Sequence, residues 1–415
     1  MNLIDVRRRR TVGAVGAALL VLLGGAPAAQ AATVTSKPAV GMTLPAPTGP
    51  YRTGTTSLHL VDRARTDAWD PARSSRELMV TLRYPARPRH GLPTAPQLPP
   101  GTAAQWDLAA RDPEAFAIPA GTADWAGTRT HAVAGAAVRR QGGGMPVVLY
   151  SPGRNMPRGF GTAVAEDLAS RGYLVVALDH THEAIAVEFP GGRVEKVRQE
   201  TEESTLRGLV DVRVADTRFV LDQLAVLNAG GNPDAEKRRL PEGLAGGIDL
   251  SSVGMFGHSL GGATAAQAMH DDPRIDAAAD LDGGVTAGGV DSVGSVVEEG
   301  LDRPFLLMNS AMGNHHHASL DPLWQRLRGW HRNLQMTTAG HYSYTDLQAQ
   351  LPQIDAVHPL PEGRLAQAVG TVPPGRSFQA QRAYVAAFFD LQLRHRDDGL
   401  LDGPSRAYPE MRFVD

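Results

Sequence analysis

From residue 146 onward, the chain alternates between two hydrophobic patterns. Short apolar runs with the length of buried strands are separated by segments in which apolar residues recur at helical spacing. Strands are expected at 146–150, 173–178, 253–256, 277–281, 304–308 and 334–338, and helices at 162–170, 211–227, 379–393 and from 261 onward. Strands that alternate with helices build a mainly parallel sheet covered on both faces, so the pattern predicts an α/β fold.

The part of the chain before residue 146 has a different pattern. Two early strands are expected at 55–61 and 77–84. After residue 146, a hairpin that pairs 185–189 with 194–197 is also expected. Residues 85–145 are rich in Pro and Gly and show little periodicity. They predict an irregular excursion that packs mainly on the surface, with part of it over the site. Residues 32–50 read as an extended lead-in, which leaves 51–415 as one catalytic domain.

The N-terminus has the features of a cleavable export signal. Four arginines at 7–10 precede an apolar stretch at 11–25, and Ala29-Gln30-Ala31 supplies the small residues of a cleavage site. The apolar stretch is too short for a comfortable membrane span and is broken by Gly24 and Gly25. The sequence therefore predicts a signal peptide at 1–31 and a secreted protein, exported by the general or the twin-arginine route.

Composition excludes several classes of function. Removal of residues 1–31 takes away a net charge of +3, so the charge changes from −3 to −6 and leaves no electrostatic footprint for nucleic acid. The chain has no cysteine, so neither a disulfide nor a thiolate metal site is available. No cofactor and no metal are expected. An exported protein of this composition must be stable through its core alone.

The strongest chemical signal is the segment Gly257-His258-Ser259-Leu260-Gly261. It fits G-x-S-x-G, follows an expected strand and precedes small residues that open a helix. That context is the nucleophile elbow, in which a sharp turn holds the serine hydroxyl above the sheet. A bare motif also recurs by chance, so the surrounding strand and helix carry the interpretation. Ser259 is the candidate nucleophile.

A serine nucleophile needs a base, and the base needs an orienting carboxylate. In α/β-hydrolases the order along the chain is serine, acid, histidine, with each group at a strand end. Asp282 ends the next expected strand at 277–281 and is preferred over Asp280, which lies inside that strand and reads otherwise as a hydrogen-bonded structural carboxylate. Asp302 and Asp321 are further candidates that turn or capping roles also explain.

His341 follows the last expected strand of the sheet on a short loop, where the base is required. His258 is held inside the elbow and is expected to point away from the serine hydroxyl. His180 and His182 suit either the pocket lining or internal hydrogen bonding, and 182–186 lacks the second histidine of a zinc motif. The run 315–317 has no spaced partners for a metal and is expected to be an exposed loop.

The tetrahedral intermediate needs two backbone donors. The amide of Leu260, directly after the nucleophile, is one candidate. The other is expected in the loop 151–155 after an early strand, at Arg154 with Asn155 as the second choice, because Gly153 lets the backbone approach closely. The loop also reads as an ordinary strand-ending turn.

Taken together, these segments resemble the platelet-activating-factor acetylhydrolase family of α/β-hydrolases, in its plasma-type and bacterial secreted branch. The matching stretches are 54–56, 58–60, 76–80, 84–85, 150–153, 167–173, 216–222, 257–264, 281–282 and 340–341. The resemblance implies an α/β-hydrolase fold, a triad of Ser259, Asp282 and His341, and backbone donors at Leu260 and Arg154. Two departures concern the substrate: the loop reads Ser-Pro-Gly-Arg where the family more often has Ser-His-Gly-Leu, and 85–145 has no match.

The expected activity is that of a secreted serine esterase. The resemblance implies a short-acyl, oxidised or ether phospholipid as substrate, hydrolysed without calcium, and transient contact with a lipid surface. Within enzymes, the alternative is a general carboxylesterase, lipase or polyester hydrolase on the same scaffold. From a different class, the alternative is a catalytically silent surface-binding protein. The sequence does not indicate an oligomeric state.

Overall fold

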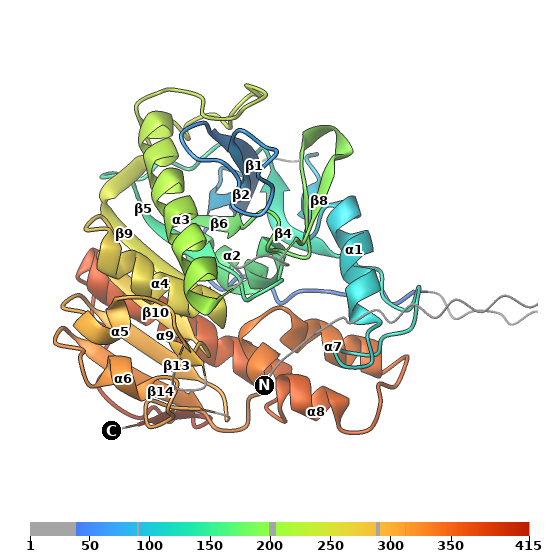
Figure 1. Cartoon of the computed structure of the whole chain (residues 1–415), viewed down its shortest axis with the longest axis vertical. Coiled ribbons are helices and arrows are strands. Elements are labelled where there is room, and N and C mark those ends of the chain that lie inside the picture. Colours follow the sequence, from blue (N-terminus) through green and yellow to red (C-terminus); the bar gives the residue numbers. More distant parts are fainter. Residues whose placement is uncertain (1–38, 89–90, 199–204, 288–290, 312, 415) are drawn as a thin grey trace, which may run out of the picture.

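A computed structural model describes residues 39–88, 91–198, 205–287, 291–311 and 313–414 (Figure 1). The expected signal peptide at 1–31 lies outside the described residues. Among the helices within them, none combines the length and the apolar character needed to cross a membrane.

The described residues form one eleven-stranded sheet with the order β15-β14-β13-β10-β9-β5-β6-β2-β1-β4-β3. Its centre is parallel, as the alternating pattern predicted. The parallel strands are β5 (Met145–Ser151), β6 (Leu174–Asp179), β9 (Ile248–His258), β10 (Ala277–Leu281), β13 (Phe305–Asn309) and β14 (His331–Met336). The observed bounds differ from the expected ones by up to three residues, except that β9 begins five residues before the expected start at 253, because strand ends depend on pairing partners as well as on the apolar run.

Further strands extend the sheet on both sides, and they are antiparallel to their neighbours at every pairing but the one between β1 and β4. β2 (Arg76–Pro85) joins β6, and β1 (Thr53–Asp62) joins β2 in antiparallel register; both were expected. Beyond them lie β4 (Arg129–Ala134) and β3 (Thr94–Pro96), and at the opposite edge lies β15 (Met411–Phe413). The expected hairpin is present as β7 (Ala186–Glu188) and β8 (Val194–Lys196). A second small pair joins β11 (Thr286–Ala287) to β12 (Asp291–Ser292).

Helices cover both faces of the sheet (Figure 1). Alternate residues of β5 explain the two layers. Val147 and Leu149 face the core that contains α3 (Leu206–Asn228) and α4 (Leu260–Asp271). Val148 and Tyr150 face the core that contains α2 (Thr162–Ser170) and α9 (Pro374–Arg394). A strand buried on both faces must be apolar along its whole length, which is the pattern of its sequence. The fold is therefore that of an α/β-hydrolase, as predicted.

The remaining helices are shorter than α3 and α9. They are α1 (Pro100–Ala110), α5 (Val296–Glu299), α6 (Asp321–Trp324), α7 (Leu347–Asp355) and α8 (Arg364–Val369), with 3-10 turns at η1 (Arg158–Gly161), η2 (Pro190–Gly192) and η4 (His341–Tyr344).

The excursion at 85–145 is more regular than expected, because it contributes β3, α1 and β4. Helix α1 was missed because apolar residues occur on both of its sides: Ala103, Trp106 and Ala110 are buried at helical spacing, but Ala104 and Leu108 are exposed, so no single apolar stripe stands out in the sequence. The excursion contributes Trp106, Phe116 and Trp125 to a core cluster that also contains residues of α7 and α8.

Candidate active site

Ser259 occupies a sharp turn between the end of β9 and the first residue of α4. Its backbone angles are φ 55° and ψ −125°, a region that residues with a side chain rarely adopt. The amide of Ser259 donates to the carbonyl of Leu281 on the neighbouring strand at 2.9 Å. The strained turn is therefore anchored to the sheet and presents the hydroxyl where β9 ends.

The glycines of the motif are required by close packing around this turn. A Cβ on Gly261 would lie 2.0 Å from the carbonyl oxygen of Ser151, and a Cβ on Gly257 would lie 2.1 Å from the carbonyl carbon of Gly261. Both contacts are with backbone atoms that cannot rotate away. The G-x-S-x-G pattern thus encodes the approach of α4 to the sheet as well as the exposure of the serine.

Asp282 and His341 form a hydrogen-bonded pair at the same edge of the sheet. Asp282 directly follows β10, and its Oδ2 lies 2.7 Å from Nδ1 of His341 in η4. The amide of Ser310 donates to the other carboxylate oxygen at 2.6 Å. Burial acts to raise the pKa of Asp282, but the bond from His341 and the Ser310 amide outweigh it and lower that pKa below its usual value. The carboxylate is held in its charged form, directed at the imidazole.

Asp280 has a different environment two residues earlier. It is fully buried, accepts a hydrogen bond from the amide of Gly283 at 2.7 Å, and lies below α4, where a Cβ on Gly262 would be 1.8 Å from its Oδ1. Burial raises its pKa to about 8. Asp280 is thus a neutral structural group at neutral pH.

The two fallback carboxylates lie in ion-pair and helix-start positions. Asp302 is exposed and pairs with Arg328. Asp321 is in the first turn of α6, where its side chain accepts from Gln325. Among the described residues, it is Asp282 that contacts His341.

His258 supports His341 from inside the elbow. It is buried, its Nε2 donates to the main-chain carbonyl of His341 at 2.9 Å, and the two rings lie 4.6 Å apart. Burial and the neighbouring imidazole lower the pKa of His258 to about 3, so it stays neutral. The expectation that it is held inside the elbow is met, but its bond to the candidate base was not foreseen. In the sequence, this bond is indicated only by the presence of a histidine directly before Ser259.

The loop 151–155 passes beside the nucleophile. A Cβ on Gly153 would lie 3.0 Å from Nδ1 of His258 and 3.4 Å from the Cβ of Ser259. The amide of Asn155 donates to Glu183 at 3.3 Å, away from the serine, and this bond favours Arg154 as the donor from this loop. Leu260 begins α4 directly after the nucleophile, at the positive end of the helix.

The other histidines have structural contacts. His180 lies 3.0 Å from Asp216 and 3.0 Å from Ser151, and both atoms of its ring that can hydrogen bond are used. His182 is buried between Asp67 and Glu195.

The histidine run 315–317 was expected to be exposed, and for His315 that expectation is wrong. His315 is buried, bonded to Asn333 and stacked on Trp324, whereas His316 and His317 are exposed. In the described part of the chain, no cluster of three or more potential metal ligands is found.

An aromatic wall approaches the site from the excursion. The ring of Phe116 lies 5.2 Å from that of Tyr342, the residue directly after His341. Trp106 packs against Phe116 and Phe160 behind it. The surface next to the candidate base is therefore apolar and aromatic.

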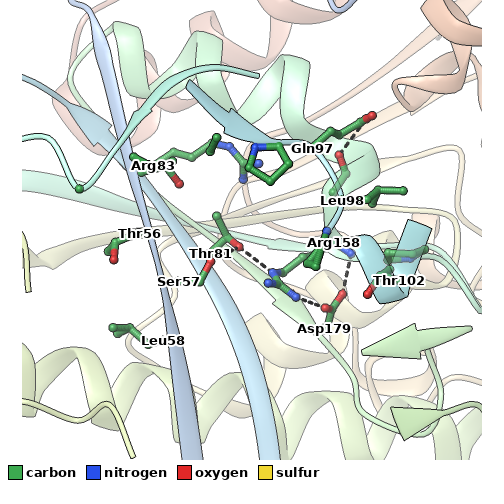
Figure 2. A pocket seen from close by; sticks show the side chains of 18 of the residues that line it. Thr56, Ser57, Leu58, Thr81, Arg83, Gln97, Leu98, Thr102, Arg158 and Asp179 are labelled. Atoms are coloured by element: carbon green, nitrogen blue, oxygen red, sulfur yellow. Dashed lines mark hydrogen bonds and ion pairs between the residues drawn. The ribbon is translucent and has the colours of Figure 1, made fainter. Parts of the chain in front are cut away.

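A separate cavity of about 430 Å³ lies between β1, β2 and the start of α1. Figure 2 shows Arg158 in this cavity, bonded to Thr81 and to Asp179. The lining includes neither Ser259 nor the residues that pair near it. The candidate site therefore does not line this cavity.

Comparison with known proteins agrees with this geometry. Residues 122–354 match the family model described as platelet-activating factor acetylhydrolase, isoform II. A protein of Arthroderma benhamiae, named probable 1-alkyl-2-acetylglycerophosphocholine esterase, is 29% identical over 398 residues, which are 90% of this chain and 94% of that protein. A solved structure, ferulic acid esterase from Streptomyces cinnamoneus, has 38% identity and a TM-score of 0.73 and covers 90% of this chain and 100% of its own.

Proposed function

The chain belongs to the platelet-activating factor acetylhydrolase, isoform II, family and is an ester-hydrolysing enzyme, and we propose that it acts as a serine esterase through an acyl-enzyme. The observation that carries the proposal is the pairing of Asp282 with His341 at 2.7 Å, at the sheet edge where Ser259 occupies its strained turn.

The reaction begins with attack of the Ser259 hydroxyl oxygen on the ester carbonyl carbon. Nε2 of His341 takes the hydroxyl proton, while Asp282 holds the opposite ring nitrogen and stabilises the imidazolium that forms. The carbonyl oxygen becomes an oxyanion on the amides of Leu260 and Arg154. When the intermediate collapses, His341 gives the proton to the leaving alcohol.

The second half repeats the same steps with water. His341 takes a proton from water, whose oxygen attacks the acyl carbon, and the acid leaves as Ser259 regains its proton. The lowered pKa of Asp282 suits this role because the carboxylate must remain charged throughout. The neutral His258 adds no competing charge beside the imidazolium.

For the substrate, we propose a short acyl ester, of the kind carried by an acetylated or oxidised glycerophospholipid. The family and the name of the Arthroderma benhamiae relative support this class. Aromatic acyl esters are the second candidate, favoured by the similarity to a ferulic acid esterase and by the aromatic wall at Phe116 and Tyr342. We propose that the protein is exported, on the strength of the expected signal at 1–31.

The serine assignment is tested with Ser259→Ala and a matched control, Ser251→Ala. Ser251 is exposed on the same strand and bonds to Asp249. Hydrolysis of p-nitrophenyl acetate is expected to fall by about 10⁵-fold or more in the first variant and to stay unchanged in the second, because loss of the nucleophile removes the covalent route. Comparable activity of the folded Ser259→Ala variant would overturn the proposal.

The substrate class is tested by kcat/KM on four esters: p-nitrophenyl acetate, p-nitrophenyl palmitate, an sn-2-acetyl ether phosphocholine and methyl ferulate. The proposal expects the acetyl esters to be preferred over palmitate and the phosphocholine over ferulate. Preference for ferulate would assign the aromatic acyl class instead, and preference for palmitate would exclude both.

A further inference from the structure

A fully buried arginine lies under the loop that carries the second oxyanion donor. Arg213, on α3, donates through Nη1 to the carbonyl of Pro152 at 2.6 Å. Through Nη2 it donates to the carbonyl of Gly153 at 3.3 Å. Its side chain is about 1% exposed, so these bonds form where water does not compete with them.

The guanidinium is itself fixed by a carboxylate. Glu183 accepts from Nε of Arg213 at 2.6 Å and from Nη2 at 2.7 Å, a two-pronged pairing. Burial acts to raise the pKa of Glu183, but the charge of Arg213 lowers it below the usual value. The same carboxylate accepts the amide of Asn155. The Arg213–Glu183 ion pair therefore forms hydrogen bonds with two carbonyls and one amide of the loop 151–155.

The direction of these bonds has a consequence for Arg154. No peptide bond in the described residues is cis, so the Gly153 carbonyl and the Arg154 N–H point in opposite directions across their shared peptide plane. The Gly153 carbonyl is held on the inner side of the loop by Arg213 at 3.3 Å and by the amide of Met156 at 3.1 Å. The N–H therefore points away from Arg213, in a loop whose Gly153 packs against Ser259 and whose Arg154 side chain is exposed.

A second set of contacts fixes the start of the loop. Nη1 of Arg213 also lies 3.1 Å from the hydroxyl of Ser151, which lies 3.0 Å from Nε2 of His180. Nδ1 of His180 in turn lies 3.0 Å from Asp216. Residue 151 ends β5, so the chain is held from the last strand residue to Asn155.

We propose that Arg213, paired with Glu183, is a positioning residue that sets the Arg154 amide as an oxyanion donor. The inference rests on the proposed function, because it requires an oxyanion beside Ser259. Arg213 does not touch the substrate. It acts by fixing the plane of one peptide, which stabilises the transition state more than the bound substrate.

The test compares Arg213→Lys with Arg382→Lys. Arg382 is a matched control, because it is 5% exposed and donates to the main-chain carbonyls of Pro45, Ala46 and Ala163, on the opposite face of the sheet. A lysine keeps the charge but cannot hold two carbonyls and a carboxylate in one plane. Melting temperature and circular dichroism establish that both variants fold and show how much each loses in stability.

The expected result for Arg213→Lys is a fall in kcat of about 100-fold, the range seen when one oxyanion donor is lost, with KM within about threefold of the parent. Affinity for n-butylboronic acid, which forms a tetrahedral adduct on the serine, should fall in proportion to kcat/KM. The Arg382→Lys variant should keep its kcat and its boronate affinity at a similar loss of melting temperature. The pH at half-maximal activity should be the same in all three proteins.

A folded Arg213→Lys enzyme with kcat within about threefold of the parent would overturn the proposal. So would a lowered kcat with unchanged boronate affinity, since that would place the damage elsewhere. If Arg213→Lys does not fold, Glu183→Gln is tested instead, because it weakens the hold on the guanidinium with little change of shape. A kcat about tenfold lower than that of the parent is expected, and an unchanged kcat would contradict the inference. In every case Ser259→Ala is measured alongside, so that failure of the serine assignment is seen separately.

Discussion

Two regions lie on either side of the turn at Ser259, and ionisable side chains have different roles in them. At the rim, Asp282 and His341 form a single pair whose imidazole is about a third exposed. Below the elbow, Asp280 and the Arg213–Glu183 pair are fully buried and bond to backbone amides and carbonyls. The rim groups are placed where a proton and a substrate can reach them. The buried groups hold the backbone that the reaction uses.

Two carboxyl groups that lie only two positions apart in the chain differ in this way: one contacts the candidate base, and the other supports the backbone. Asp280 and Asp282 flank Leu281, yet the pKa of Asp280 is raised to about 8 while that of Asp282 is lowered. Burial acts on both carboxyls. Only Asp282 also has a hydrogen bond from the His341 imidazole, together with the amide of Ser310, to offset burial. The hydrogen-bond partners of each carboxyl group, and not its burial, therefore decide whether it is charged at neutral pH.

Between the two carboxyls, the larger effect is expected from Asp282→Asn, with Asp280→Asn as its matched control. The asparagine at 282 would favour the wrong tautomer of His341, and kcat on p-nitrophenyl acetate should fall by about 10⁴-fold. Asp280→Asn should keep kcat within about threefold, since that residue touches neither the base nor the nucleophile. Steady-state kinetics on both proteins checks this. The reverse ranking would remove Asp282 as the orienting acid.

A smaller effect is expected in the pH dependence of stability. The pKa of Asp280 is raised in the folded protein, so its contribution is fully present below the unfolded pKa near 4 and is lost as pH rises through about 8. A tenfold difference in proton affinity between the folded and the unfolded protein corresponds to about 1.4 kcal/mol of stability. Asp280→Asn should therefore gain at least about 1 kcal/mol relative to the parent between pH 5 and pH 9, measured by urea unfolding.

The contribution of Asp282 to the free energy of unfolding changes with pH in the opposite direction. Its folded pKa is lowered, so its contribution is present above the unfolded pKa and is lost as pH falls through the folded one. The stability difference between the parent and Asp282→Asn should shrink toward low pH. If Asp280→Asn instead followed this direction, the neutral state assigned to the buried carboxyl would be wrong.

Much of the fold could be predicted because its information is local. Most central strands are apolar runs bounded by polar or glycine residues, and residues 162–170 and 277–281 were placed with the observed bounds. The order of Ser259, Asp282 and His341 was predictable for a related reason: each group follows a strand, and parallel strands place their carboxyl ends at one edge.

The support beneath the site could not be predicted in the same way. Arg213 contacts carbonyls some 60 positions earlier, and a backbone carbonyl leaves no trace in the residue types. His258 reaches the main chain of His341 across the sheet edge. Helix α1 was missed because its exposed side also carries apolar residues, Ala104 and Leu108, which obscure the buried stripe. These features depend on which segments meet in space, which the pattern along the chain does not encode.

The most direct test of the serine assignment is covalent labelling followed by peptide mapping. The folded protein, its Ser259→Ala variant and its Ser251→Ala variant are treated with a fluorophosphonate, which reacts with activated serines, and digested for mass spectrometry. One phosphonylated peptide, containing Ser259, is expected in the parent and in Ser251→Ala, and none in Ser259→Ala. A label on another serine, or no label on a protein that still hydrolyses p-nitrophenyl acetate, would contradict it.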